Sequence, residues 1–154
     1  MKPGLGTQLR HIIELLDGAV AKSYERAGLD YRPRYTPVMR ALMELETCTI
    51  NELASYAGIT QPAATQTIKL MIKANLIVTK VNQDDGRQKL IELSDYGRSI
   101  LPVLESCWKA TKSAGKSLSD DLGFSLPDML AEVIEVLEKK SFQQRIEEAR
   151  QRQE

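Results

Sequence analysis

The chain has 154 residues, 42% of them hydrophobic and 27% charged, a composition typical of one soluble globular domain and not of disordered, collagenous or disulfide-rich secreted chains. Lysine and arginine total 21, and aspartate and glutamate also total 21, so the net charge does not by itself favour nucleic acid. Aromatic residues are only 5%, which disfavours single-strand binding by base stacking. Because no apolar run approaches the ~18 residues of a membrane span and no signal peptide is evident, we expect a cytoplasmic protein without a membrane partner.

The N-terminal third predicts two helices. Over residues 7–27, apolar side chains recur at steps of three and four residues, the period of a helix with one buried stripe. Gly28 predicts the end of that helix. Thr36 followed by Pro37 predicts an N-cap with proline in the first helical position, and a second helix that continues to Leu45.

A helix-turn-helix pattern follows. The sequence Thr49–Glu52 fits a capping box, which predicts the start of a short helix that ends before Gly58. Thr60 then stands where it can cap a further helix over residues 61–74. Two helices joined by a short turn that contains glycine are typical of a helix-turn-helix.

The next segment predicts a β-hairpin. Residues 76–81 and 89–93 are rich in strand-forming side chains, and they flank the turn-forming residues 82–86. A hairpin directly after a helix-turn-helix is a wing. Ser94 then predicts the cap of a long helix over residues 95–117, in which Pro102 kinks the helix or lies in its first turns.

The C-terminal part predicts one more helix. We expect a polar break at residues 119–121, and Ser125 with Asp128 suggests a second capping box. From there one apolar stripe continues to Ile146. The predicted fold is therefore mainly α with a small β-hairpin wing: a single domain over residues 1–154, with a winged helix-turn-helix at 34–97 and helical dimerisation parts at 1–30 and 98–154.

An ordered set of motifs resembles the MarR family of bacterial winged-helix transcriptional regulators. The set comprises residues 52–62, residues 75–77 and the wing pattern D-x-R-x-x-x-(I/L)-x-L-(S/T)-x-x-G, which runs from Asp85 to Gly97. The resemblance covers nearly the whole chain in helix order and length. It departs at Asn75, where the family usually has glycine, and at Gln66, where many members have arginine. Asparagine also tolerates the left-handed conformation, so the first departure leaves the fold unchanged.

The expected DNA-reading helix is residues 61–74, which contains two lysines and no acidic side chain. Glutamine can pair with adenine through two hydrogen bonds, and lysine can reach guanine or phosphate. Arg87 is expected to enter a minor groove, and the resemblance implies that Asp85 orients it. The alternatives are a solvated surface helix and a surface ion pair. The expected DNA-binding residues are Thr60, Gln61, Thr65, Gln66, Lys69, Lys73, Asp85 and Arg87.

The sequence therefore predicts a DNA-binding transcriptional regulator, most simply a repressor, that binds a pseudo-palindromic operator as a homodimer. The alternative is a winged-helix module for protein interactions without sequence-specific DNA binding. An enzyme is disfavoured, since the chain has one histidine, no phosphate-binding glycine loop and no catalytic constellation. We expect no cofactor and no metal, because Cys48 and Cys107 lack metal-ligand spacing.

The resemblance also implies release from DNA by small aromatic or phenolic ligands, without supplying the residues that bind them. The residues expected to line such a pocket are His11, Leu15, Met39, Met43 and Trp108. A fully packed junction without ligand is the alternative. The sequence favours His11 as a partly buried helix residue over a ligand, and Trp108 as a packing or dimer contact over effector stacking. It also favours both cysteines as reduced packing residues over redox sensors.

Overall fold

The computed structural model describes residues 1–153, which form helices and three short strands. In chain order these are α1 (Leu5–Arg26), the 3₁₀ turn η1 (Pro33–Tyr35), α2 (Thr36–Leu45), β1 (Thr47–Cys48), α3 (Ile50–Ala57), α4 (Gln61–Lys73), β2 (Ile77–Val81), β3 (Lys89–Leu93), α5 (Asp95–Ser99), α6 (Leu101–Leu122), α7 (Leu126–Lys139) and α8 (Phe142–Gln151). The predicted fold class, mainly helical with a β-hairpin, is confirmed.

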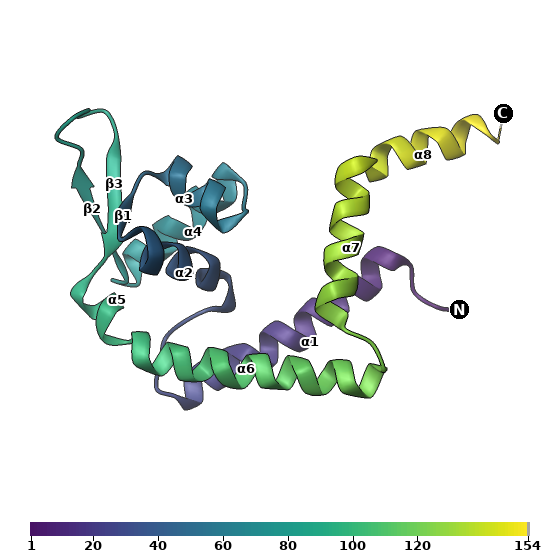
Figure 1. Cartoon of the computed structure of the whole chain (residues 1–154), viewed down its shortest axis with the longest axis horizontal. Helices are drawn as coiled ribbons and strands as arrows, with labels where there is room; N and C mark the ends of the chain where they lie inside the picture. Colours follow the sequence, from purple (N-terminus) through teal and green to yellow (C-terminus); the bar gives the residue numbers. More distant parts are fainter. Residues whose placement is uncertain (154) are drawn as a thin grey trace. The chain divides into compact units, whose positions relative to one another are not determined.

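Two compact units make up the chain, Met1–Trp108 and the segment from Lys109 onward. The first unit contains the winged helix-turn-helix, in which the β2–β3 hairpin extends beyond helices α2 to α4 (Figure 1). Among residues 1–153 the structure contains no helix with the length and hydropathy that crossing a bilayer requires.

The helix ends of the helix-turn-helix form where the sequence predicts them. The Thr49 hydroxyl accepts the Glu52 backbone N–H, and the Glu52 carboxylate accepts the Thr49 N–H at 2.8 Å. Gly58 ends α3 with φ of 67°, the left-handed conformation that glycine adopts without strain. The Thr60 hydroxyl accepts the Ala63 N–H and so caps α4. Local side-chain chemistry therefore fixes both ends of the turn.

A third strand, β1, was not predicted. It pairs antiparallel with β3 through Thr47 opposite Glu92 and Cys48 opposite Ile91, so the sheet order is β1-β3-β2. The pairing was missed because β1 has only two residues, too few for an alternating pattern to be recognised.

The end of α4 is held tightly against the start of α5. Asn75 has φ of 61°, which confirms that asparagine takes the left-handed conformation there. The Ser94 hydroxyl donates to the Asn75 carbonyl at 2.5 Å and accepts the Gly97 N–H at 2.9 Å. A Cβ atom at Gly97 would lie 2.4 Å from the Leu76 carbonyl oxygen. Only glycine fits at this crossing. We call the four residues that form it, Asn75, Leu76, Ser94 and Gly97, the α4–α5 junction.

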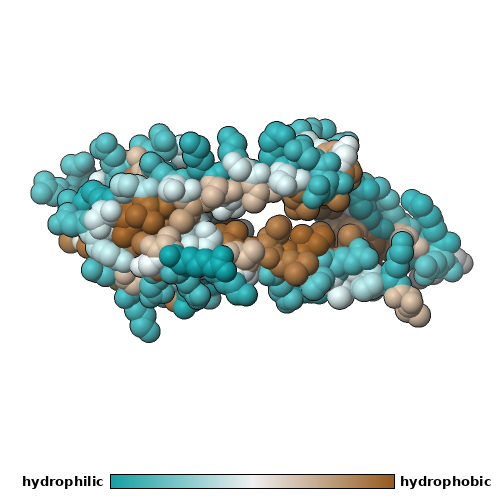
Figure 2. Space-filling view, turned by 90° about the horizontal axis from the view of Figure 1, so that it is seen from below, coloured by the Kyte–Doolittle hydropathy of each residue, from teal (hydrophilic) through white to brown (hydrophobic). Residues whose placement is uncertain are grey.

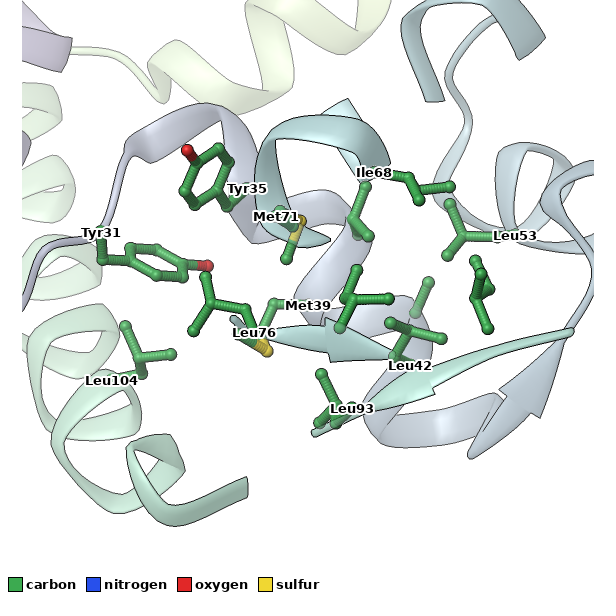
Figure 3. Packing of buried hydrophobic residues seen from close by; sticks show 14 of the residues in the cluster. Tyr31, Tyr35, Met39, Leu42, Leu53, Ile68, Met71, Leu76, Leu93 and Leu104 are labelled. Carbon is green, nitrogen blue, oxygen red and sulfur yellow. The ribbon is translucent and has the colours of Figure 1, made fainter. Parts of the chain in front are cut away.

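One hydrophobic core joins the elements of the first unit. Figure 3 shows core side chains that converge from the helices and the hairpin, including Met39 of α2, Met71 of α4 and Leu93 of β3. Met39 and Met71 are fully buried, and Leu93 is 4% exposed. The buried faces of α2 and α4 therefore leave their opposite faces free for other contacts.

A buried polar cluster corrects the predicted role of Thr36. Thr36 is not an N-cap: its backbone is already helical because η1 continues directly into α2. Its hydroxyl instead lies 3.2 Å from the Tyr31 hydroxyl and 3.5 Å from that of Tyr24. Trp108 donates its indole N–H to the Tyr24 hydroxyl at 3.1 Å. Buried phenol groups need hydrogen-bond partners. This requirement explains why the Thr36 hydroxyl is directed toward the tyrosines and does not cap α2.

The C-terminal helices differ from the prediction in three places. The expected helix over 95–117 is split into α5 and α6 at Ile100, just before Pro102. The expected polar break at 119–121 is wrong, because α6 continues to Leu122 and ends before Gly123, whose φ is 78°. The single helix expected to reach Ile146 is two, α7 and α8, since Ser141 and Gln144 form a capping box that starts a new helix.

The α4–α5 junction generates a test of stability. Gly97→Ala should lower the free energy of unfolding by about 1–3 kcal/mol or more, because the new Cβ meets a backbone oxygen that cannot move aside alone. Gly18→Ala is the matched control: Gly18 lies inside α1 with open space around the added Cβ, so it should stabilise by about 0.5–1 kcal/mol. Urea unfolding measures both. Equal stability of the two variants would contradict the packing described.

Cys48 generates a test of thiol reactivity. It is 2% exposed, and burial, together with the nearby Glu52 carboxylate, raises the pKa of its thiol to about 11. At pH 8 iodoacetamide should therefore modify Cys48 at least about tenfold more slowly in the native chain than in urea, as peptide mapping would measure. The raised pKa also means that the contribution of this thiol to stability is present below pH ~9 and is lost as the pH rises toward 11. Rapid native labelling would favour the redox interpretation instead.

Candidate functional site

The polar face of α4 is open along its whole length. The core-facing side of α4 consists of its buried residues, Ala64, Thr67, Ile68 and Met71. The opposite side of the helix is therefore its outer face. Gln61, Gln66, Lys69 and Lys73 are exposed and Thr65 is half-buried. The first part of this face forms a shallow concave surface lined by Gln61, Pro62, Ala63, Thr65, Gln66 and Lys69. The structure thus brings together the α4 residues that the sequence predicted as one site.

Thr60 has a structural role at the same surface. Its hydroxyl caps α4, so the side chain holds the helix start in place. The free backbone N–H groups of a helix start carry partial positive charge, and α4 has no acidic residue in its first turn. The beginning of α4 therefore adds positive potential to the concave surface.

The wing carries Arg87 at its tip. Arg87 is exposed, and its backbone N–H donates to the Asp85 carboxylate at 3.0 Å. The Asp84 N–H donates in the same way to the Asn82 side chain. Within residues 1–153, no ion pair joins Arg87, Lys69 or Lys73 to an acidic side chain. Asp85 thus orders the backbone beneath Arg87 and leaves the guanidinium available.

Lys80 behaves differently from the other wing cations. Its ammonium lies 2.8 Å from the Glu92 carboxylate, which also accepts the Thr47 hydroxyl at 3.2 Å. The Lys80 hydrogen bond, followed by that of Thr47, lowers the pKa of Glu92. Lys80 is therefore paired at the wing although it is exposed, whereas Arg87 and Lys89 are exposed without an ion pair among residues 1–153.

Sequence reasoning missed Arg34. This residue lies in η1, and its guanidinium donates to Gln66 Oε1 and to Thr67 Oγ1, both at 3.4 Å. A cation thus joins the α4 surface from a segment that is about thirty residues earlier in the chain. No local pattern could have indicated it, since the contact depends on how η1 packs against α4.

The five residues expected to line a ligand pocket lie in different environments. Met39 is fully buried, Trp108 is 9% exposed, and Met43 is half-buried. Leu15 is 61% exposed, and the side chain of His11 is 68% exposed. The interpretation of His11 as a partly buried residue is wrong for this chain, because it lies on the polar face of α1, near Glu14.

The cysteines and acidic groups offer no metal centre. Cys48 and Cys107 are both buried, and the described residues contain no cluster of three His, Cys, Asp or Glu side chains that could hold a metal ion. The exposed polar face of α4, with Arg34 bonded to Gln66 and the exposed Arg87 on the wing, is the candidate site of the first unit.

Comparisons with known proteins give a family-model match over part of the chain and a fold. A family model described as "MarR family" matches residues 28–88. A search of curated proteins finds no match. Three solved structures illustrate the fold similarity. The transcriptional regulator MOSR of M. tuberculosis in complex with DNA has a TM-score of 0.67 and 19% identity, with 87% of this chain and 93% of that chain covered.

The second structure is the transcriptional repressor CouR bound to a 23-mer DNA duplex, with a TM-score of 0.67, 20% identity and coverage of 85% of this chain and 92% of that chain. The third is NadR in complex with 4-hydroxyphenylacetate, with a TM-score of 0.53, 22% identity and coverage of 86% and 93%. Similarity at these identities establishes the fold.

Proposed function

We propose that this chain is a member of the MarR family, whose model matches residues 28–88, and that it is a transcriptional regulator that binds double-stranded DNA. The observation that carries the proposal is the exposed face of α4, which lacks acidic residues, together with the exposed Arg87 of the wing. An α-helix fits the major groove of DNA, and an extended arginine fits a minor groove. A cytoplasmic location is part of this proposal. The proposal does not include catalysis, because the MarR family is one of regulators and not of enzymes.

We assign the DNA contacts as follows. The residues that we expect to face the bases line the concave surface of α4; they are Gln61, Thr65, Gln66 and Lys69. Lys73 lies at the last turn of α4 and is placed to contact phosphate. Thr60 and Asp85 act through structure, the first by capping α4 and the second by ordering the backbone of Arg87.

A homodimer is the second part of the proposal. On α1, the exposed apolar side chains are Leu5, Leu9, Ile12, Ile13, Leu15 and Leu16. On α7, they are Met129, Leu130, Val133, Ile134, Val136 and Leu137. Neither α7 nor α8 contains a buried residue, and brown hydrophobic patches remain open at the surface in Figure 2. Monomers rarely expose apolar patches larger than a few hundred Å², so a second copy of the chain is the occupant we propose.

Repression and release by a ligand complete the proposal. A two-fold dimer places its two reading helices about 34–36 Å apart, one turn of DNA, and so requires a pseudo-palindromic operator. CouR is a repressor bound to DNA, and NadR is a protein in complex with a phenolic acid; we propose repression and release by a small aromatic or phenolic ligand for this chain by analogy. Release requires that the ligand prefer a spacing of the reading helices that DNA does not accept.

Two substitutions test DNA binding. Arg87→Ala should weaken binding to duplex DNA from the region upstream of the gene by roughly 1–3 kcal/mol, because it removes the wing contact. Lys73→Ala should weaken binding to all sequences alike and reduce the slope of log affinity against log salt by about one. Lys22→Ala removes the same charge from the polar face of α1 and serves as control. If Arg87→Ala folds normally and binds as tightly as the unaltered chain, the wing assignment is wrong.

The dimer is tested by light scattering at micromolar concentration in physiological salt. The expected mass is twice the chain mass of 17.3 kDa. Val133→Glu should raise the dissociation constant of the dimer at least about tenfold, because it would bury an unpaired charge in the interface. Glu132→Ala, one residue away, should leave it unchanged. A monomeric unaltered chain would overturn this part of the proposal.

A further inference from the structure

Arg34 is attached to the flank of α4, between the outer face of the helix and its buried face. Its Nη2 donates to Gln66 Oε1 and to Thr67 Oγ1, each at 3.4 Å. Gln66 is exposed, whereas the next residue, Thr67, is 4% exposed and belongs to the core-facing side. Successive residues of a helix lie about 100° apart around its axis, so the guanidinium lies beside the helix and not on its outermost surface.

The positive charge of Arg34 is not neutralised at this place. The side chain is exposed, and no acidic side chain among residues 1–153 forms an ion pair with it. A guanidinium carries five N–H donors. Because both recorded bonds of Arg34 use Nη2, the donors on Nη1 and Nε remain for a further acceptor. Both present partners are neutral oxygens, so Arg34 offers its full charge to that acceptor.

A cation on the flank of a helix in the major groove faces a wall of the groove. The groove is ~12 Å wide, and an α-helix with its side chains is about 10–12 Å across, so the helix fills the groove. Its outer face then meets the bases, and its flanks meet the two sugar-phosphate backbones. Phosphate oxygens accept strong, charge-assisted hydrogen bonds from arginine, often two at once. The position and the remaining donors of Arg34 therefore suit a phosphate better than a base edge.

We propose that Arg34 binds a phosphate on one wall of the major groove that α4 occupies, and that this contact fixes the position of α4 across the groove. Phosphate contacts set the register of a protein on DNA without reading its sequence. Arg34 is thus a further DNA-contacting residue, supplied by η1, and Thr67 anchors it from the core side of α4. The inference rests on the proposed function, binding of double-stranded DNA.

The first experiment measures how tightly the full-length chain binds the duplex from upstream of its gene and an unrelated duplex, over a range of salt concentrations. Arg34→Met keeps the apolar stem and removes the guanidinium. It should weaken binding to both duplexes by about tenfold at physiological salt. It should also reduce the slope of log affinity against log salt by about 0.9 for each protomer bound, because one phosphate contact is lost. Urea unfolding checks that each variant keeps the fold.

Arg32→Met is the matched control. Arg32 is an exposed arginine at the N-cap of the same turn, and among residues 1–153 the bonds from η1 side chains to α4 come from Arg34. Removal of the Arg32 charge should therefore leave the salt slope unchanged. If Arg32→Met and Arg34→Met reduce the slope equally, general positive charge near η1 explains the effect, and the inference is overturned.

Thr67→Val tests the anchor without removing a group that DNA can reach, since Thr67 is 4% exposed. The substitution places a methyl group where the hydroxyl was. It should weaken DNA binding roughly two- to fivefold, because Arg34 loses one of its two acceptors. In an Arg34→Met background it should have no effect, since both side chains act through the same contact. Equal effects in the two backgrounds would contradict the anchoring role of Thr67.

Three results would overturn the inference, and they are distinguishable. If the unaltered chain binds no duplex, the proposed function fails and the inference fails with it. If the unaltered chain binds DNA and Arg34→Met keeps the full salt slope, Arg34 contacts no phosphate and the proposed function stands. If Arg34→Met changes the preference among bases instead of weakening both duplexes alike, Arg34 reads a base edge, so the inference is wrong and the proposed function again stands.

Discussion

The crossing of two backbone segments at the α4–α5 junction is the constraint on which the rest of the first unit depends. The Leu76 carbonyl approaches Gly97 so closely that no side chain fits between them, and Ser94 bonds to both sides of the crossing. Since α4 ends on one side and β3 ends on the other, this contact sets where the helix stands relative to the hairpin. A helix and a wing can bind one DNA molecule only if that spacing is fixed, so the junction serves the proposed function without touching DNA.

The buried polar cluster adds a second constraint on the same unit. Tyr24, Tyr31 and Tyr35 stack edge to face, with ring centroids 4.7 and 5.5 Å apart along the series. Thr36 is a hydrogen-bond partner of the Tyr31 phenol, and Trp108 donates to the Tyr24 phenol. The rings fix the turn η1, and η1 carries Arg34 outward to α4. Packing inside the domain thus places a charged group on its surface. Burial raises the pKa of Tyr31 above its ordinary value, so this phenol stays neutral throughout the physiological range.

Much of this fold could be predicted from the sequence because its signals are local. Caps such as Thr49 and Thr60, the glycine stop at Gly58 and the left-handed Asn75 depend on a few neighbouring residues, and all form as expected. The α4 face was predictable for the same reason. The role of Thr36, the strand β1 and the contact between Arg34 and Gln66 depend on residues distant in the chain. No short pattern encodes them.

The pairing of Lys80 with Glu92 has a consequence for solubility. Strand β2 forms a free edge of the three-stranded sheet, and Val78 and Val81 on it are exposed. Such an edge is a template for strand addition by another chain, and proteins commonly guard it with lysine. A chain that added to β2 would have to accommodate the Lys80 ammonium, which Glu92 holds in place at 2.8 Å. A lysine on the free edge of the sheet thus disfavours strand addition at the wing.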